Sequence, residues 1–184
     1  MSVAPSAAPR RPLHLRRITC EAFEREDGLL EVEGLLIDTK PMPVRLPTGR
    51  GIEAEAAIHQ MRVRLAVSRD RWIVEAHAYS EAHPYPECAE VEAAYQKLVG
   101  LRIEPGFTRR VKQLFRGEAG CTHMSELLPP MATTVFQALW ADSDFANSAP
   151  VASSPVGACH GLRLDGQVVR THFPVYRKDR KESK

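Results

Sequence analysis

The sequence predicts an α+β fold: an antiparallel β meander with about three helices packed on one of its faces. Two observations predict it. In the first half of the chain apolar and polar residues alternate, as along half-buried strands, and in the second half apolar residues recur at spacings of three and four, as along helices. A Pro-Tyr-Pro break at residues 84–86 separates the halves. Strands first and helices second is the order typical of the α+β class.

Four segments alternate in the manner of strands. Asp27-Gly28 supplies a tight turn between the first two, because both residues tolerate positive φ. The alternation slips in phase at Arg16-Arg17, which predicts a bulge in the first strand. A loop over residues 41–57 precedes the third strand, and loops of this length often bind ligands. The predicted strands are residues 13–23, 30–40, 61–67 and 72–79.

Three helices are predicted after the break. The first covers Cys88–Val99, and Gly100 ends it. The second covers residues 105–116 and begins with a proline, which is favoured in a first turn. The third has Thr122 as its expected N-cap, and Pro129-Pro130 should kink it or split it in two.

The chain is expected to form one α+β domain with irregular ends. Asp165-Gly166 predicts the turn of a C-terminal β hairpin that belongs to the same domain. The Ala/Pro/Ser-rich start predicts a disordered leader, and the charged end predicts a solvated tail. The expected segments are a leader at 1–12, the catalytic or binding domain at 13–141, a linker at 142–157, the hairpin at 158–176 and the tail at 177–184.

Composition narrows the partners. The chain has 25 Lys+Arg against 23 Asp+Glu, a balance that argues against a nucleic-acid partner, since such domains usually show a basic excess. No apolar run approaches the length of a membrane span, so no membrane partner is expected. With no export signal and only four cysteines, we expect a reduced, cytoplasmic protein. A homo-oligomer is compatible with this composition.

The segment Gly120–Glu126 is the most informative for chemistry. It places the thiol of Cys121, the imidazole of His123 and the carboxylate of Glu126 at the start of a predicted helix, where free N–H groups and the helix dipole favour anions. Cys88 occupies the same kind of position at the start of the first helix. The alternative for both cysteines is that they are small buried residues that fill gaps.

Two further candidates lie on the predicted strands. Asp38 stands where the second strand leaves the sheet and is either a turn-former paired with Lys40 or a general base at the rim. His59 shares the strand parity of the inward Met61, which predicts a half-buried histidine, either structural or catalytic. Arg62 has the opposite parity and is either solvated or an anion contact.

A set of short motifs runs through residues 13–139. They are Arg25-Glu26-Asp27-Gly28-Leu29, Gly34-x-x-x-Asp38-Thr39-Lys40, Ile58-His59-Gln60-Met61, Pro84-Tyr85-x-x-Cys88, Leu98-Val99-Gly100-Leu101-x-Ile103-x-Pro105-Gly106-Phe107 and Gly120-Cys121-Thr122-His123-Met124-Ser125-Glu126-Leu127-Leu128. Together they resemble a bacterial family catalogued as domain-of-unknown-function family 2889. The resemblance implies a hydrolase of aroyl-CoA thioesters, such as vanilloyl-CoA, in the bacterial degradation of lignin-derived aromatic compounds.

The first functional hypothesis is therefore an acyl-CoA thioesterase that needs no cofactor. The N–H groups at the start of the third helix would polarise the thioester carbonyl. Asp38, His59 or His123 would activate water as a general base, or Cys121 would attack covalently. The expected contacts with the CoA thioester are Lys40, Arg62, Tyr85, Arg109, Arg110 and Glu126.

The alternative hypothesis is a metal or iron–sulfur binding module. A looser similarity to iron–sulfur scaffold proteins of the NifU-like fold implies the same meander-and-helix architecture, with ligands after a strand and at two helix starts. The ligands to zinc or to an iron–sulfur cluster would be Asp38, Cys88, Cys121 and His123. Both hypotheses expect the strand-exit carboxylate and the two thiol-bearing helix starts to converge on one pocket.

Overall fold

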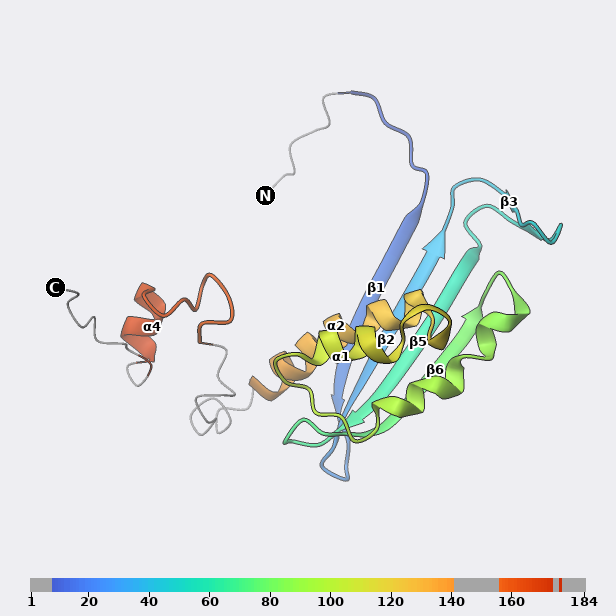
Figure 1. Cartoon of the computed structure of the whole chain (residues 1–184). Helices are drawn as coiled ribbons and strands as arrows, with labels where there is room; N and C mark the ends of the chain where they lie inside the picture. Colours follow the sequence, from blue (N-terminus) through green and yellow to red (C-terminus); the bar gives the residue numbers. More distant parts are fainter. Residues whose placement is uncertain (1–7, 141–155, 174–175, 177–184) are drawn as a thin grey trace. The chain divides into compact units, whose positions relative to one another are not determined.

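The protein contains a four-stranded antiparallel sheet, as the sequence predicts. The structure is a computed structural model that describes residues 8–140, 156–173 and 176. The strand order β1-β2-β5-β6 follows the order of the chain, so the sheet is a meander (Figure 1). Its strands are β1 (Leu15–Glu24), β2 (Leu30–Thr39), β5 (Ala57–Val67) and β6 (Ile73–Ala82).

The bulge predicted in the first strand is wrong. The register between β1 and β2 is continuous from Leu15 opposite Thr39 to Glu24 opposite Leu30. The apolar pattern is interrupted there because a charged residue, Arg16, occupies an inward position in phase with Ile18. The irregularity lies instead between β2 and β5, at Asp38 and Thr39.

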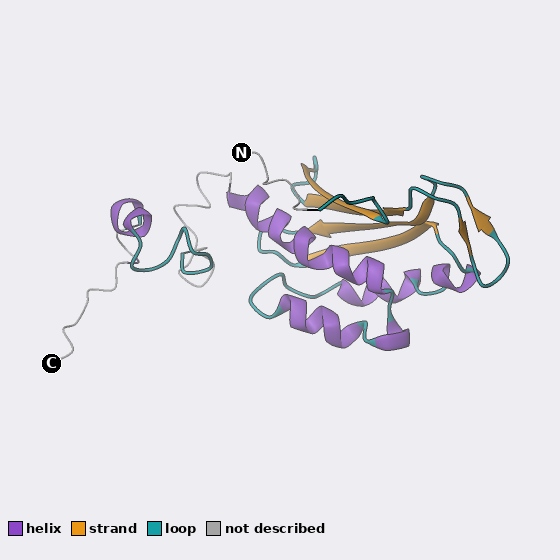
Figure 2. Cartoon of the chain, turned by 90° about the horizontal axis from the view of Figure 1, so that it is seen from above, coloured by secondary structure: helices purple, strands orange, loops and turns teal. Residues whose placement is uncertain are grey.

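All helical segments before residue 140 lie on one side of the sheet (Figure 2). The predicted first helix is two 3₁₀ segments, and the predicted second helix is a shorter α-helix. The third is continuous through Pro129 and Pro130, because its buried stripe packs on the sheet over the whole length. The segments are η1 (Pro86–Ala89), η2 (Glu92–Leu98), α1 (Phe107–Leu114), η3 (Gly117–Ala119) and α2 (Thr122–Trp140).

The core lies between the inner face of the sheet and α2. Gly34 permits the close approach of the two layers, since a Cβ atom there would lie 2.6 Å from the sulfur of Met131. The fully buried members of this core include Val32, Leu36, Met61, Leu65, Leu127, Leu128 and Met131. The helix therefore has a fixed seat on β2, and this seat fixes where its N-terminus lies.

The long loop between β2 and β5 has structure of its own. It contains a small hairpin of β3 (Val44–Arg45) and β4 (Gly51–Ile52). A separate apolar cluster of Leu46, Ile52 and Ile58 lies beneath it. No described helix is long and apolar enough to cross a bilayer.

The chain divides into two compact units, Met1–Ala138 and Leu139–Lys184. In the second unit the predicted C-terminal hairpin is replaced by α4 (Gln167–His172). Successive turns occupy the positions of the first expected strand, with Leu162 N–H bonded to Cys159 O and Gly166 N–H to Arg163 O. The described part of this unit contains no strand, and residues 167–172 satisfy their backbone as a helix. The predicted tail at 177–184, most of the predicted linker and the start of the leader lie outside the described residues.

Candidate functional site

A row of polar side chains crosses the inner face of the sheet at one end. Arg16 on β1, Asp38 on β2 and His59 on β5 are direct cross-strand neighbours, and all three share the inward parity of the core residues. Cross-strand neighbours on one face lie close enough for their side chains to interact. The register of three strands therefore assembles this row.

A bulge ends the row. Asp38 pairs with His59, but the next residue, Thr39, pairs with Ala57, so Ile58 is an extra residue on β5. Ile58 joins the apolar cluster under the β3–β4 hairpin. Bulges re-aim side chains and are frequent beside active sites. Here the bulge lets His59 face the helices while its neighbour packs under the loop.

Asp38 is the centre of the cluster and is only 1% exposed. Its two carboxylate oxygens accept hydrogen bonds from the Arg16 guanidinium, both at 2.8 Å, and His14 Nε2 lies 3.1 Å from Oδ1. Burial alone would raise the pKa of Asp38, but the bonds from Arg16 and His14 outweigh it and lower the pKa to about 2. Asp38 is therefore a fixed anion.

Two imidazoles stack beside this anion. The rings of His59 and His123 have their centroids 3.8 Å apart and are inclined by 27°. His59 Nδ1 lies 3.2 Å from Asp38 Oδ2, and His123 Nε2 lies 3.6 Å from the same oxygen. Despite its proximity, His59 Nδ1 is not aligned for a hydrogen bond and is a buried nitrogen without such a partner among the described residues.

Both histidines are neutral at neutral pH. Burial lowers the pKa of His59, and the neighbouring His123 lowers it further, against the attraction of Asp38. Burial also lowers the pKa of His123, and the charge of Arg16 adds to this effect. Each ring therefore has a nitrogen lone pair that can accept a proton or bind a cation.

Cys121 lies on the other side of His123, at the start of α2. Its Sγ atom is 3.7 Å from His123 Nδ1. Its backbone carbonyl accepts the first bond of the helix, from Ser125 N–H at 2.9 Å, so Cys121 rather than Thr122 is the N-cap residue. The fully buried Tyr95 holds this backbone: its hydroxyl donates to Cys121 O at 2.8 Å and accepts from Cys121 N–H at 3.1 Å.

The approach to this helix start is sterically fixed at Gly120. A Cβ atom on Gly120 would lie 2.4 Å from Cβ of Phe115 and 2.9 Å from its Cα. The ring of Phe115 stacks on Tyr95, with centroids 4.3 Å apart. The tyrosine that anchors Cys121 and the backbone that leads into it therefore pack against the same residue.

These contacts form a thiol–imidazole–carboxylate series, Cys121–His123–Asp38. In such a series the carboxylate orients the imidazole, and the imidazole takes the proton of the thiol. The structure thus brings together four of the predicted residues: Asp38, His59, Cys121 and His123. Glu126 joins them indirectly, through its ion pair with Arg16.

Other predicted residues lie elsewhere. Cys88 is on η1, where its carbonyl accepts a bond from the Ser80 hydroxyl, and its thiol is not part of the ligand group of Asp38, His59 and His123. Arg62 pairs with Glu33 and Glu81 on the opposite face of the sheet. Strand parity therefore places Arg62 and Asp38 on opposite faces of the sheet, and the substrate contact expected of Arg62 stays a prediction.

Lys40 and Tyr85 flank the sheet without touching the cluster. The Lys40 ammonium lies 3.4 Å from Leu13 O, where it ties the segment before β1 to the end of β2. Tyr85 precedes η1 and is 38% exposed, and its carbonyl accepts a bond from the His83 ring at 2.7 Å. Among the described residues, neither Lys40 nor Tyr85 forms a hydrogen bond or ion pair with Asp38, Cys121, His59 or His123.

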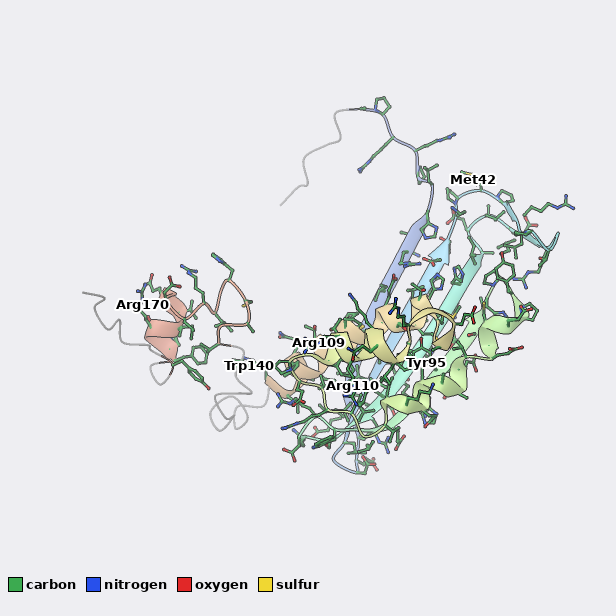
Figure 3. The ribbon with its side chains drawn as sticks, viewed as in Figure 1. Met42, Tyr95, Arg109, Arg110, Trp140 and Arg170 are labelled. Carbon is green, nitrogen blue, oxygen red and sulfur yellow. The ribbon has the colours of Figure 1, made fainter. Side chains whose placement is uncertain are left out.

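Arg109 and Arg110 project from α1 (Figure 3). Three surface hollows of about 350, 590 and 380 Å³ follow one another along this helix; Arg109 lines the second and third of them, and Arg110 lines the third. The first hollow begins at Thr122, next to Cys121, and shares Lys112 with the second. The second shares Arg109 with the third. The second hollow, lined by Arg109, Lys112 and Arg116, is therefore a basic groove along α1.

Sequence reasoning missed His14, Arg16 and Tyr95. The uninterrupted even-numbered phase of residues 16, 18, 20 and 22 would have placed Arg16 on the inward face, had the arginine pair not been interpreted as a bulge. Tyr95 was assigned to an apolar stripe, and its spacing carries no sign that its hydroxyl would bond the backbone of Cys121, 26 residues later.

The comparisons with known proteins agree with the motifs. The model of a family described as proteins of unknown function, DUF2889, matches residues 14–137, which include every member of the cluster. Searches of curated proteins and of solved structures gave no match. Because the family match covers more than half of the chain, the protein belongs to the DUF2889 family.

Proposed function

We propose that the protein is an acyl-CoA thioesterase that uses Cys121 as its nucleophile. The observation that carries the proposal is the series of contacts from Cys121 Sγ to His123 Nδ1, at 3.7 Å, and from His123 Nε2 to Asp38 Oδ2, at 3.6 Å. The first distance is that of a hydrogen bond to sulfur, and the second is slightly longer than a hydrogen bond, which is usual in catalytic groups before substrate binds. A neutral His123 beside a permanently ionised Asp38 is the protonation state that a general base requires.

The reaction proceeds in two acyl transfers. His123 takes the proton of Cys121, and the thiolate attacks the thioester carbonyl, so that an S–C bond forms to the enzyme. The bond to the CoA sulfur then breaks, and the CoA thiolate takes the proton from His123. In the second transfer water loses a proton to His123 and attacks the acyl-enzyme, which releases the free acid and returns the proton to Cys121.

The remaining residues of the cluster support these steps. Asp38, held by Arg16, stabilises the positive His123 that forms in each transfer. Stacked His59 keeps water from one face of that ring. N–H groups in the first turn of α2 point toward the start of the helix, where they can stabilise the oxyanion. The basic groove along α1, with Arg109, Lys112 and Arg116, suits the phosphates of CoA.

The experiment is a hydrolysis assay over a panel of aliphatic and aromatic acyl-CoA esters, with free CoA measured by chromatography. Wild type should hydrolyse members of the panel, and Cys121→Ala should lower the rate by about a thousandfold or more. Cys88→Ala is the matched control, a cysteine at another helix start, and should keep the wild-type rate within about threefold. Failure of wild type on the whole panel, or full activity of Cys121→Ala, would reject the proposal.

Zinc binding is the second candidate, and one observation favours it. Ligand atoms of Asp38, His59 and His123 all lie within 4.8 Å of one another, and two imidazoles with a carboxylate are common zinc ligands. Against it, Arg16 bonds both oxygens of Asp38, so a cation would have to share or displace the guanidinium. An iron–sulfur cluster fits less well, because such clusters need several thiolates and Cys88 is not in the group.

Elemental analysis and zinc titration separate the two candidates. A zinc protein should hold about one metal ion per chain after purification. His59→Ala should then lose the metal while Cys121→Ala retains it. For the thioesterase the dependence is reversed: Cys121→Ala abolishes hydrolysis, and a chelator leaves the wild-type rate unchanged.

A further inference from the structure

The two edges of the sheet differ in how their backbone groups are satisfied. At β6 the chain that follows the strand covers the edge: Ile73 exchanges bonds with Gly100 and Leu101, and the Glu92 carboxylate accepts from Ser80 N–H at 2.6 Å. At the other edge lies β1, a ten-residue strand whose side chains are mostly exposed. Long exposed edge strands are templates for pairing with another chain.

The backbone of β1 is arranged for such pairing. The hairpin closes with a bond from Arg25 N–H to Leu29 O, at 2.9 Å, and the register with β2 is unbroken. Because bonded pairs alternate along an antiparallel ladder, the odd-numbered residues of β1 bond β2. The even-numbered residues, among them Ile18, Cys20 and Ala22, direct their N–H and C=O groups away from the sheet.

The outer face of β1 differs from the outer face of the neighbouring strands in its charge pairing. On the outer face of the sheet Arg62 and Arg64 form ion pairs with glutamates of neighbouring strands. Arg17 and Glu21, on the same face of β1, form no ion pair among the described residues. The odd-numbered residues 15–23 form a stripe along this face of β1. Leu15 and Phe23, at its two ends, are 40% and 47% exposed.

This stripe is complementary to itself. When β1 is laid antiparallel to a second β1 with Thr19 opposite Thr19, Arg17 faces Glu21 and Leu15 faces Phe23, each twice by symmetry. The register also pairs Ile18 with Cys20 through their outward backbone groups, as an antiparallel ladder requires. A shift by two residues in either direction breaks both matches, since it sets Arg17 opposite Thr19 or Phe23.

We infer that β1 pairs with β1 of a second copy of this chain, about a two-fold axis through Thr19, and joins two sheets into one. The occupant is a second copy because the charges and apolar residues of the edge match their own reverse order. Such an interface is isologous and closed, as in most homodimers. It does not depend on the function proposed above.

Charge reversal tests this register. Sedimentation analysis from about 1 μM to about 1 mM should show a dimer for wild type. Arg17→Glu and Glu21→Arg should each raise the dissociation constant by at least about tenfold, since two attractive pairs become repulsive. The double variant should return to the wild-type value. Lys97→Glu, an exposed reversal on η2, is the matched control and should change nothing.

A cross-link gives a second, independent measurement. In a Cys20→Ala background, Thr19→Cys should form an intermolecular disulfide on oxidation, because opposed residues of an unbonded antiparallel pair have their Cα atoms at a distance that a disulfide spans. A monomeric wild type over the whole concentration range overturns the inference. So does a dimer that is indifferent to the single reversals, or one that the double variant does not restore.

Discussion

The sheet carries arginine–carboxylate pairs on both of its faces, and the two sets do different work. On the inner face Arg16 holds a carboxylate that is 1% exposed, beneath two histidines. On the outer face Arg62 joins Glu33 and Glu81, whose side chains are 29% and 32% exposed. Solvent screens the outer pairs, so each contributes little, whereas loss of Arg16 from the inner pair would leave the buried Asp38 carboxylate without its guanidinium partner and without water. The burial of the carboxylate, and not the length of the ion pair, therefore distinguishes the inner pair at the candidate site from the outer pairs on the surface.

The largest expected effect is that of Asp38→Asn. It removes the charge that accepts both bonds from Arg16 and faces His14, and we expect the free energy of unfolding to fall by about 2 kcal/mol, as for lost hydrogen bonds to a charged group. Denaturant unfolding at neutral pH measures it. Glu126→Gln is the matched control: it removes a partner of the same arginine that is 46% exposed, and should cost less than about 1 kcal/mol. Equal losses in the two variants would contradict the contrast between buried and exposed partners.

The next largest effect is a pH dependence of the stability that Asp38 contributes. The pKa of Asp38 is lowered to about 2 by the fold, below the value of about 3.9 in an unfolded chain, so its stabilising contribution is complete above pH 4 and is lost as the pH falls toward 2. The difference in unfolding free energy between wild type and Asp38→Asn should therefore shrink by about 2 kcal/mol between pH 5 and pH 2. A difference that stays constant over this range would show that Asp38 titrates normally.

A smaller loss of stability is expected when the bonds between the Tyr95 hydroxyl and the Cys121 backbone are removed. Tyr95→Phe removes the hydroxyl that bonds both backbone groups of Cys121, and should cost about 1 kcal/mol of stability. It should also lower thioester hydrolysis by about tenfold, because the thiol is no longer held beside His123. Tyr79→Phe, on the outer face and 40% exposed, is the control and should leave both quantities unchanged.

The smallest effect is expected on the outer face. Glu81→Gln removes a partner of Arg62 while Glu33 remains, and should change the unfolding free energy by less than about 0.5 kcal/mol. Thermal unfolding at low and high salt checks it, since added salt should shrink even this small difference. A loss as large as that of Asp38→Asn would remove the distinction between the two faces.

The sequence predicted the fold class because strand alternation and helical spacing are local patterns. Asp38 and His59 could be placed inward for the same reason: each shares parity with apolar neighbours such as Leu36 and Met61. The contact between Asp38 and His59 could not be predicted, because it depends on the register of three strands and on a bulge. The extra residue of that bulge, Ile58, has no local sequence signature.

The failures have a common cause. Val168 and Val169 favour a strand locally, yet residues 167–172 are helical, and the described part of the second unit contains no strand with which they could pair. Arg16 resembled a disturbance of the pattern because a charge is not expected on a buried face. In both cases the deciding fact is a neighbour distant in sequence, which propensity does not report.

One feature of α2 shapes how the cluster would respond to motion. Cys121 and His123 stand on a single turn, so any tilt or slide of that helix carries sulfur and ring together and leaves their spacing intact. Only the gap to Asp38, which belongs to the sheet, widens or narrows. Substitutions beneath the helix, for instance at Gly34, should thus change the orientation and basicity of the His123 ring, while Cys121 stays beside that ring.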